Sequence, residues 1–130
     1  IVKNNPSYWA FIRELKNDKT SRENSMHSHE ITVEEHRSYM KMHGDKYYIC
    51  LEDSTPVGYV GFNASGYISI AVVEDSRKKG LAKQMLTYVS QELEKKDLKA
   101  IVHISNLASV RLFEACGFVK QYYIFEGEEQ

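Results

Sequence analysis

The spacing of apolar side chains predicts two helices in the first third of the chain. In residues 6–16 apolar positions recur at intervals of three and four, which gathers on one helical face Tyr8, Phe11, Ile12 and Leu15. A second helix is predicted over residues 33–43, because Thr32 and Glu35 have the spacing of a capping box and Gly44 follows the last turn. The polar stretch between the two helices shows neither the helical nor the strand period of apolar residues, so a loop is predicted there.

Runs that are rich in β-branched and aromatic residues predict strands, and two further helical stretches interrupt them. The predicted strands are residues 1–3, 47–52, 57–63, 67–73 and 99–105, with a last one from residue 118 onward. The further helices are residues 81–93 and 106–117. The early strands follow one another through short turns, whereas the later ones alternate with helices. This order predicts an α/β (α+β) fold with a mixed, mostly antiparallel central sheet that helices flank, in a single domain of residues 1–130.

Composition bounds the function without naming it. The 130 residues are 42% hydrophobic and 27% charged, which is ordinary for one globular domain with its own core. The net charge of −1 gives no electrostatic support for a nucleic-acid partner, and the longest apolar runs are far too short to span a membrane. The first five residues have no signal-peptide pattern. The chain opens on Ile1 rather than methionine, which leaves a preceding segment open.

The cysteines and histidines predict neither a disulfide framework nor a metal site. Cys50 and Cys116 lie far apart in the sequence, which favours reduced thiols and a cytoplasmic location. The histidines in residues 27–43 lack the supporting cysteine or carboxylate pattern of a metal centre.

The most informative segment joins the predicted strand 67–73 to the helix that starts near Leu81. The cations that crowd this helix N-terminus are Arg77, Lys78, Lys79 and Lys83. Helix N-termini attract anions, because their first N–H groups lack acceptors and the dipole is positive there. Gly80 lets the backbone come close to a ligand, so the segment predicts a pyrophosphate site. Taken alone it also fits a solvated surface loop, and it matches neither the Walker A loop nor the G-x-G-x-x-G fingerprint.

A second segment favours the pyrophosphate interpretation. Residues 77–82 fit the pattern Q/R-x-x-G-x-G/A, and residues 106–118 fit N-x-x-A/S-x-x-L/F-Y/F-E-x-x-G-F. In this order, with one helix and one strand between them, the two segments resemble the motifs of the GNAT superfamily of N-acetyltransferases. The resemblance covers all but the two ends of the chain, and it implies a GNAT-like sheet and acetyl-CoA as co-substrate.

The resemblance also implies which residues bind the cofactor. In the family, the strand before the phosphate loop splays from the next strand, and its backbone pairs with the pantetheine arm. Main-chain groups of Ala71, Val72 and Val73 are expected to do so here, with one N–H stabilising the oxyanion. The expected pyrophosphate contacts are Arg77, Lys78, Lys79, Gly80, Leu81, Ala82 and Lys83. The second motif implies cofactor contacts from Asn106, Ser109 and Phe113, and Asn106 also suits a helix N-cap.

The catalytic positions depart from the family pattern. The tyrosine that protonates the leaving thiolate in many members is Phe113 here, and the glutamate base of members that acetylate protein N-termini is Ile101. His103 is the best remaining base, because strand alternation would put it on the same face as Ile101 and its ordinary pKa suits pH 7. Tyr122 and Tyr123 on the last predicted strand are candidate catalytic phenols. For these three side chains a purely structural role is the alternative.

A site with weak acid–base groups favours a weakly basic acceptor. At pH 7, deprotonating a lysine-like amine costs about 4.6 kcal/mol, whereas an amine of pKa near 8 costs about 1.4 kcal/mol. A sugar amine or an α-amine therefore fits better than a polyamine. Segments 17–18 and 31–36, as N-D and I-T-x-E-E-H, are also similar to short bacterial GNAT members of amino-sugar pathways. The loop before the second helix usually walls the acceptor pocket in the family, so the candidate acceptor contacts are Tyr8, His29 and Glu30, with loop solvation or helix packing as the alternative.

The sequence therefore predicts an acetyl-CoA-dependent enzyme that acetylates a primary amine of a small molecule, preferably an amino sugar on a sugar nucleotide. One alternative is a protein N-terminal α-amine acetyltransferase, and another is a non-catalytic acyl-CoA-binding or sensor domain. No metal, nucleic-acid or membrane partner is expected, and the protein is expected to be a monomer or a homodimer.

Overall fold

Strands of the N-terminal half pair in the order in which they occur in the sequence. The computed structural model describes residues 1–18, 30–92 and 97–128, and in these the sheet has the order β1-β2-β3-β4 with every pair antiparallel. The strands are β1 (Val2–Lys3), β2 (Tyr47–Glu52), β3 (Thr55–Phe62) and β4 (Ile68–Val72). The predicted fold class, a mixed α/β arrangement built on an antiparallel sheet with flanking helices, is confirmed.

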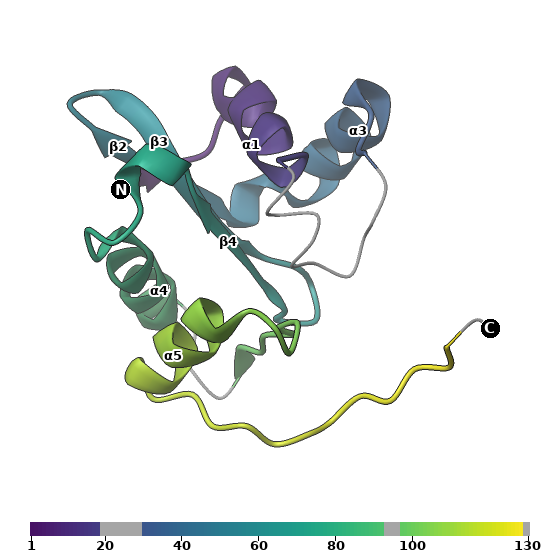
Figure 1. Cartoon of the computed structure of the whole chain (residues 1–130). Coiled ribbons are helices and arrows are strands. Elements are labelled where there is room, and N and C mark those ends of the chain that lie inside the picture. Colours follow the sequence, from purple (N-terminus) through teal and green to yellow (C-terminus); the bar gives the residue numbers. More distant parts are fainter. Residues whose placement is uncertain (19–29, 93–96, 129–130) are drawn as a thin grey trace.

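Helices cover both faces of this sheet (Figure 1). On one face lie η1 (Pro6–Tyr8), α1 (Trp9–Lys16), α3 (Val33–His43) and η2 (Gly44–Lys46). On the other lie α4 (Leu81–Glu92), which η3 (Glu74–Ser76) precedes, and α5 (Leu107–Ala115). Strand alternation divides the core between the two faces: Tyr47, Ile49 and Tyr59 pack against α1 and α3, while Tyr48, Val60 and Val72 pack against α4.

The helix ends follow the signals in the sequence. The Thr32 hydroxyl accepts from the Glu35 amide (3.1 Å), and the Glu35 carboxylate accepts from the Thr32 amide (3.4 Å), so the predicted capping box is confirmed. At α5, the Asn106 side chain accepts from the Ser109 amide (3.2 Å). Gly117 ends this helix with a φ of +88°, in the left-handed region that glycine adopts without strain.

The β2–β3 hairpin turns on two residues, which makes β3 start earlier than predicted. Asp53 and Ser54 both have positive φ (51° and 66°), as the right-handed twist of a two-residue hairpin requires. Pro56, predicted to lie in the turn, instead sits in β3 opposite Leu51, where the pairing register shifts. Such an irregularity tolerates a residue that cannot donate to the ladder.

Two predicted strands are wrong for the described residues. Residues 99–105 pair with the sheet only through a parallel bridge between Tyr67 and Lys99, and the chain then leaves β4. The described segment after Phe118 carries no strand, and it runs extended and exposed from α5 to residue 128 (Figure 1). β-Propensity is present in both segments, but a strand also needs a neighbouring backbone, and the divergence after Lys99 removes it. Over the described ranges, no helix combines the length and apolarity needed to cross a bilayer.

Candidate active site

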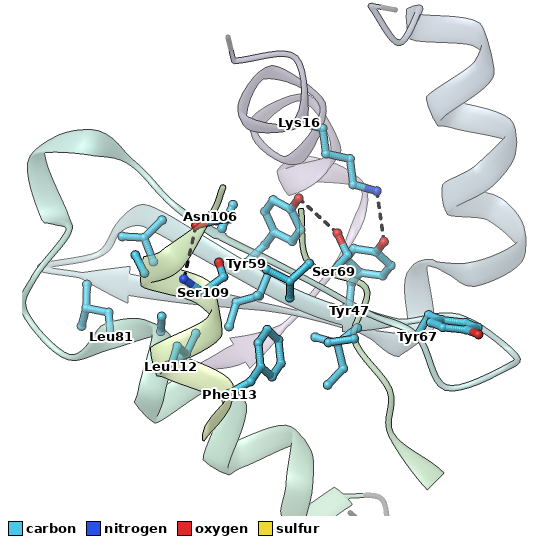
Figure 2. Close-up of a pocket in the computed structure, with 18 of the residues that line it drawn as sticks. Lys16, Tyr47, Tyr59, Tyr67, Ser69, Leu81, Asn106, Ser109, Leu112 and Phe113 are labelled. Atoms are coloured by element: carbon cyan, nitrogen blue, oxygen red, sulfur yellow. Dashed lines mark hydrogen bonds between the residues drawn. The ribbon is translucent and has the colours of Figure 1, made fainter. Parts of the chain in front are cut away.

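A cavity of about 1190 Å³ opens where the chain leaves β4. Its walls come from β4, residues 100–102, the start of α4, and α5, and its far end reaches α1 and α3. Figure 2 shows side chains of these elements converging on one space from opposite faces of the sheet. The cavity therefore joins the two sequence motifs to a part of the molecule that neither motif includes.

The edge of β4 offers unpaired main-chain groups to this cavity. The Val73 amide donates to the Val57 carbonyl (2.8 Å). In an antiparallel pair the main-chain N–H groups of successive residues point alternately toward and away from the neighbouring strand, so the Ala71 N–H also points toward β3. Ile70 and Val72 then point their N–H groups the other way. The same alternation holds at Ile68, whose amide donates across the gap to the Lys99 carbonyl (2.8 Å). Of the three N–H groups expected to serve the cofactor, that of Val72 is directed at the cavity.

The loop after β4 is held in shape by Arg77. Its Nε donates to the Val72 carbonyl (2.9 Å), and its Nη2 forms an ion pair with Asp18 at the end of α1 (3.3 Å). Lys78 and Gly80 have positive φ (67° and 78°), which turns the backbone sharply into α4. The first helical hydrogen bond runs from the Gln84 amide to the Gly80 carbonyl (3.1 Å), so the amides of residues 81–83 precede it and have no acceptor within the helix.

The cationic side chains of this loop differ in their availability. Lys79 forms an ion pair with Glu52 on the hairpin (3.2 Å), and Arg77 donates to the Val72 carbonyl. Lys78 and Lys83 are exposed. The helix N-terminus, with two exposed lysines beside it, suits a diphosphate.

Replacing Gly80 with valine is expected to weaken CoA binding by about tenfold, against only a few-fold for Lys78→Ala. A left-handed backbone costs an L-residue about 1–2 kcal/mol, so valine shifts the loop and its amides away from the diphosphate. Lys78→Ala keeps the backbone and removes one exposed charge, worth about 0.3–1 kcal/mol near a helix N-terminus. Isothermal titration calorimetry with CoA compares the two variants. Equal, small losses would show that the loop is solvated surface.

The second motif supplies one polar and one apolar wall. Asn106 and Ser109 both line the cavity, and the Asn106 Oδ1 is used as the α5 cap (Figure 2). Phe113 is buried and packs edge-to-face on Phe118, with ring centroids 5.3 Å apart. The position at which the resemblance implies a phenol is thus an apolar wall here, and it cannot protonate a thiolate.

Asn106→Asp is expected to weaken acetyl-CoA binding without lowering the melting temperature. The carboxylate still accepts from the Ser109 amide, so the cap is kept. The substitution removes the Nδ2 donor, which bonds to no residue in the described ranges and which suits a pantetheine carbonyl. Calorimetry and thermal unfolding separate the two effects. Unchanged cofactor affinity would leave Asn106 with its capping role alone.

The cavity ends at a group of side chains that the sequence analysis did not identify. Lys16 at the end of α1 donates to the Tyr47 hydroxyl (3.0 Å), and Tyr59 and Ser69 bond hydroxyl to hydroxyl (3.2 Å; Figure 2). His36 lies beside them on α3, buried, with no hydrogen-bond partner at Nε2 within the described structure. Lys16 could have been found from its position four residues after Ile12, because this spacing puts a cation on the apolar face of the helix.

The side chains predicted for catalysis do not lie in this cavity. His103 is exposed in a turn, where its Nδ1 bonds to the Ser105 hydroxyl (2.8 Å), and the strand alternation invoked for it fails because residues 100–105 are not a strand. Tyr122 and Tyr123 are 88% and 82% exposed in the C-terminal segment. The structure thus brings none of these three side chains into the cavity.

The predicted acceptor contacts are likewise not brought together. Tyr8 packs beside the α1 core and Glu30 is exposed, and neither lines the cavity. His29 lies outside the described residues. In the part of the chain that is described, no three His, Cys, Asp or Glu side chains gather as a metal-binding group.

Comparison with known proteins identifies the class of protein that this fold and cavity define. Residues 9–118 match the model of the acetyltransferase (GNAT) family, and the chain belongs to that family. It is an acetyl-CoA-dependent N-acetyltransferase. A search of curated protein sequences gave no significant match.

Solved structures share the fold at low sequence identity. yncA from Salmonella typhimurium, solved with its cofactor acetyl-CoA, is 18% identical with a TM-score of 0.75, over 89% of this chain and 76% of that one. A spermidine N-acetyltransferase from Vibrio cholerae, in complex with CoA and spermine, is 17% identical with a TM-score of 0.75, over 96% and 83%. A ribosomal-protein-alanine N-acetyltransferase from Brucella melitensis is 16% identical with a TM-score of 0.73, over 88% and 81%. These similarities concern the fold.

Proposed function

We propose that this enzyme transfers the acetyl group of acetyl-CoA to the amine of a sugar nucleotide, with the thioester at the open edge of β4. The observation that carries the proposal is the pair of main-chain N–H groups, those of Ile70 and Val72, that face the cavity and have no acceptor among the described residues. They lie between an anion-binding helix N-terminus and the polar end near Lys16. Cofactor and acceptor can thus meet at Val72 from opposite ends of one cavity.

The reaction in this geometry is direct transfer. The neutral amine attacks the thioester carbon, a C–N bond forms, and the C–S bond breaks with its electron pair leaving on sulfur. The Val72 N–H stabilises the negative charge that develops on the carbonyl oxygen. The amine loses one proton to water and the CoA thiolate takes one up, because Phe113 and Ile101 can do neither. The thiolate, with a parent pKa near 8.5, leaves unprotonated at pH 7 at a cost of about 2 kcal/mol.

The proposed acceptor class follows from this weak acid–base equipment. An amine of pKa near 8 is partly neutral at pH 7, whereas a polyamine nitrogen must first lose a proton at about three times the free-energy cost. The stretch similar to amino-sugar enzymes is used structurally in this chain. The Asn17 side chain donates to the Ile31 carbonyl (2.9 Å) and accepts from its amide (2.6 Å). These two hydrogen bonds to the Ile31 backbone fix the start of α3. They therefore also fix the position of His36 and Tyr39 beside the cavity.

The test is release of CoA thiol with a panel of amines at pH 7. The panel comprises a nucleotide-linked amino sugar, a free amino sugar, a short peptide with a free N-terminus, and spermidine. The highest kcat/KM is expected for the nucleotide-linked amino sugar. A peptide that outperforms it would favour an N-terminal acetyltransferase, and CoA binding without turnover of any amine would favour a non-catalytic domain.

A further inference from the structure

Lys16 is enclosed by aromatic rings at the end of the cavity that α1 and α3 line. Its Nζ lies 4.8 Å from the ring centroids of Tyr39 and Tyr47 and 5.8 Å from that of Tyr59. Figure 2 shows the side chain reaching from α1 toward the rings on the sheet. Ring faces attract an ammonium group, so this enclosure favours the charged form.

The enclosed ammonium lacks an anionic partner within the described residues. Charged groups that are taken out of water are normally paired. The ion pairs of the described structure involve Arg77 and Lys79, not Lys16. The nearby carboxylate of Glu35 lines the cavity but is held in the α3 capping box.

The groups around Lys16 do not neutralise it. Burial raises the pKa of Tyr59 to about 12 and that of Tyr47 further, so both phenols stay protonated at neutral pH. Desolvation, with the charges of Lys16 and Arg13, lowers the pKa of His36 to about 4, so its imidazole is uncharged. Desolvation lowers the pKa of Lys16 itself to about 8, which still leaves it mostly charged at pH 7.

We propose that Lys16 binds an anionic group of the acceptor, a phosphate or a carboxylate, and so selects amines that also carry negative charge. An ammonium has three N–H donors, and the described structure uses one of them, toward Tyr47. Two donors and the positive charge remain for a ligand at the cavity wall. The unpartnered Nε2 of His36, buried beside them, supplies one further hydrogen-bonding atom.

The proposal rests on the proposed function and narrows its substrate class. A polyamine or aminoglycoside brings further cations to the acceptor end, where Lys16 repels them. A phosphorylated amino sugar or a sugar nucleotide brings the complementary charge. A carboxylate offers the same chemistry, and the experiment separates these two sources.

Matched acceptor pairs and three variants test the proposal kinetically. The pairs are glucosamine 1-phosphate with glucosamine, and glycine with glycinamide. Each kcat/KM is divided by the fraction of the amine that is neutral at the assay pH, because a neighbouring anion also raises the pKa of the amine. In the wild-type enzyme, one anionic member is expected to have a kcat/KM about 10- to 100-fold above its uncharged partner, the gain typical of a hydrogen bond to a charged group. The pair that shows the preference identifies phosphate or carboxylate as the anion. Equal values in both pairs would overturn the proposal.

The variants separate anion binding from proton transfer and from folding. Lys16→Met is expected to bring the preference to about one, while Lys16→Arg, which keeps the charge but cannot accept a proton, retains most of it. Lys41→Met, on the exposed side of α3, is the matched control and leaves the preference unchanged. If Lys16→Arg and Lys16→Met lose activity equally with all four acceptors, Lys16 is a proton acceptor and the proposal is wrong.

A binding measurement tests the inference even if no amine is acetylated. Unreactive N-acetylglucosamine 1-phosphate is titrated into protein with isotope-labelled lysines, and the Lys16 pKa is followed by NMR. An upward shift with this probe, absent with N-acetylglucosamine, supports anion binding. No shift would overturn it. If the proposed function is wrong, none of the amines will cause release of the CoA thiol.

Discussion

Replacing the backbone amide of Val72 by an ester is expected to lower kcat by about 10²- to 10³-fold. The substitution, α-hydroxyvaline in place of Val72, exchanges N–H for oxygen and keeps the buried side chain. The Val72 N–H points away from β3 into the cavity, where it would face the carbonyl oxygen of the thioester. Removing one donor of this kind from an oxyanion site typically has an effect of this size. Steady-state kinetics with saturating acetyl-CoA measure it.

The adjacent residue provides the matched control. An ester at Val73 removes the hydrogen bond to the Val57 carbonyl, so it is expected to reduce stability by about 0.5–1.5 kcal/mol while kcat stays near that of the wild type. Denaturant unfolding measures this loss. If the two esters lowered kcat equally, the oxyanion would not be bound at Val72.

Gly61→Ala is expected to destabilise the fold by about 1–3 kcal/mol and to reduce acceptor turnover. Tyr47 lies flat across Gly61, and a Cβ at this position would meet the Tyr47 ring at 2.5–2.6 Å. Tyr47 is fully buried, so the ring can move only by displacing its neighbours. Its displacement also breaks the hydrogen bond to Lys16. Chemical denaturation gives the stability change, and kcat/KM gives the loss at the site.

A second substitution shows whether this contact is the cause. Tyr47→Leu removes the ring atoms that the new Cβ would meet. The double variant Gly61→Ala/Tyr47→Leu is therefore expected to be more stable than the sum of the two single changes predicts. Strict additivity would mean that Gly61 and Tyr47 do not constrain each other. Gly127→Ala, at a position with nothing within 4 Å of the added atom, controls for the glycine change itself.

Local signals were sufficient for most of the fold. The period of α1, the capping box of α3 and the Gly117 end of α5 depend on residues that are close in sequence, and each has a direct physical cause. The sequence also predicts a cofactor side of the site, because the strand, the cationic turn and the helix start follow one another along the chain. The sequence does not reveal that Arg77 forms an ion pair with Asp18 and Lys79 with Glu52, because the two partners in each pair are distant in sequence.

The rest of the site depends on contacts between distant segments. Lys16, Tyr47 and Tyr59 meet because α1 crosses β2 and β3, and no local pattern encodes that crossing. The assignment of His103 assumed a strand that needs a neighbour beyond Lys99, and the chain leaves the sheet there. Phe113 could be excluded as an acid from its side chain alone, whereas identifying the groups at the acceptor end requires the three-dimensional arrangement.

The most direct test of this account is a crystal structure with an acetyl-CoA analogue in which the thioester sulfur is replaced by a methylene group. The account predicts that the diphosphate lies on the amides that begin α4. It also predicts that the pantetheine arm bonds to the main chain of β4 at Ile70 and Val72, with the acetyl oxygen at the Val72 N–H. An analogue bound elsewhere, or a β4 edge covered by residues 118–125 in its presence, would contradict it.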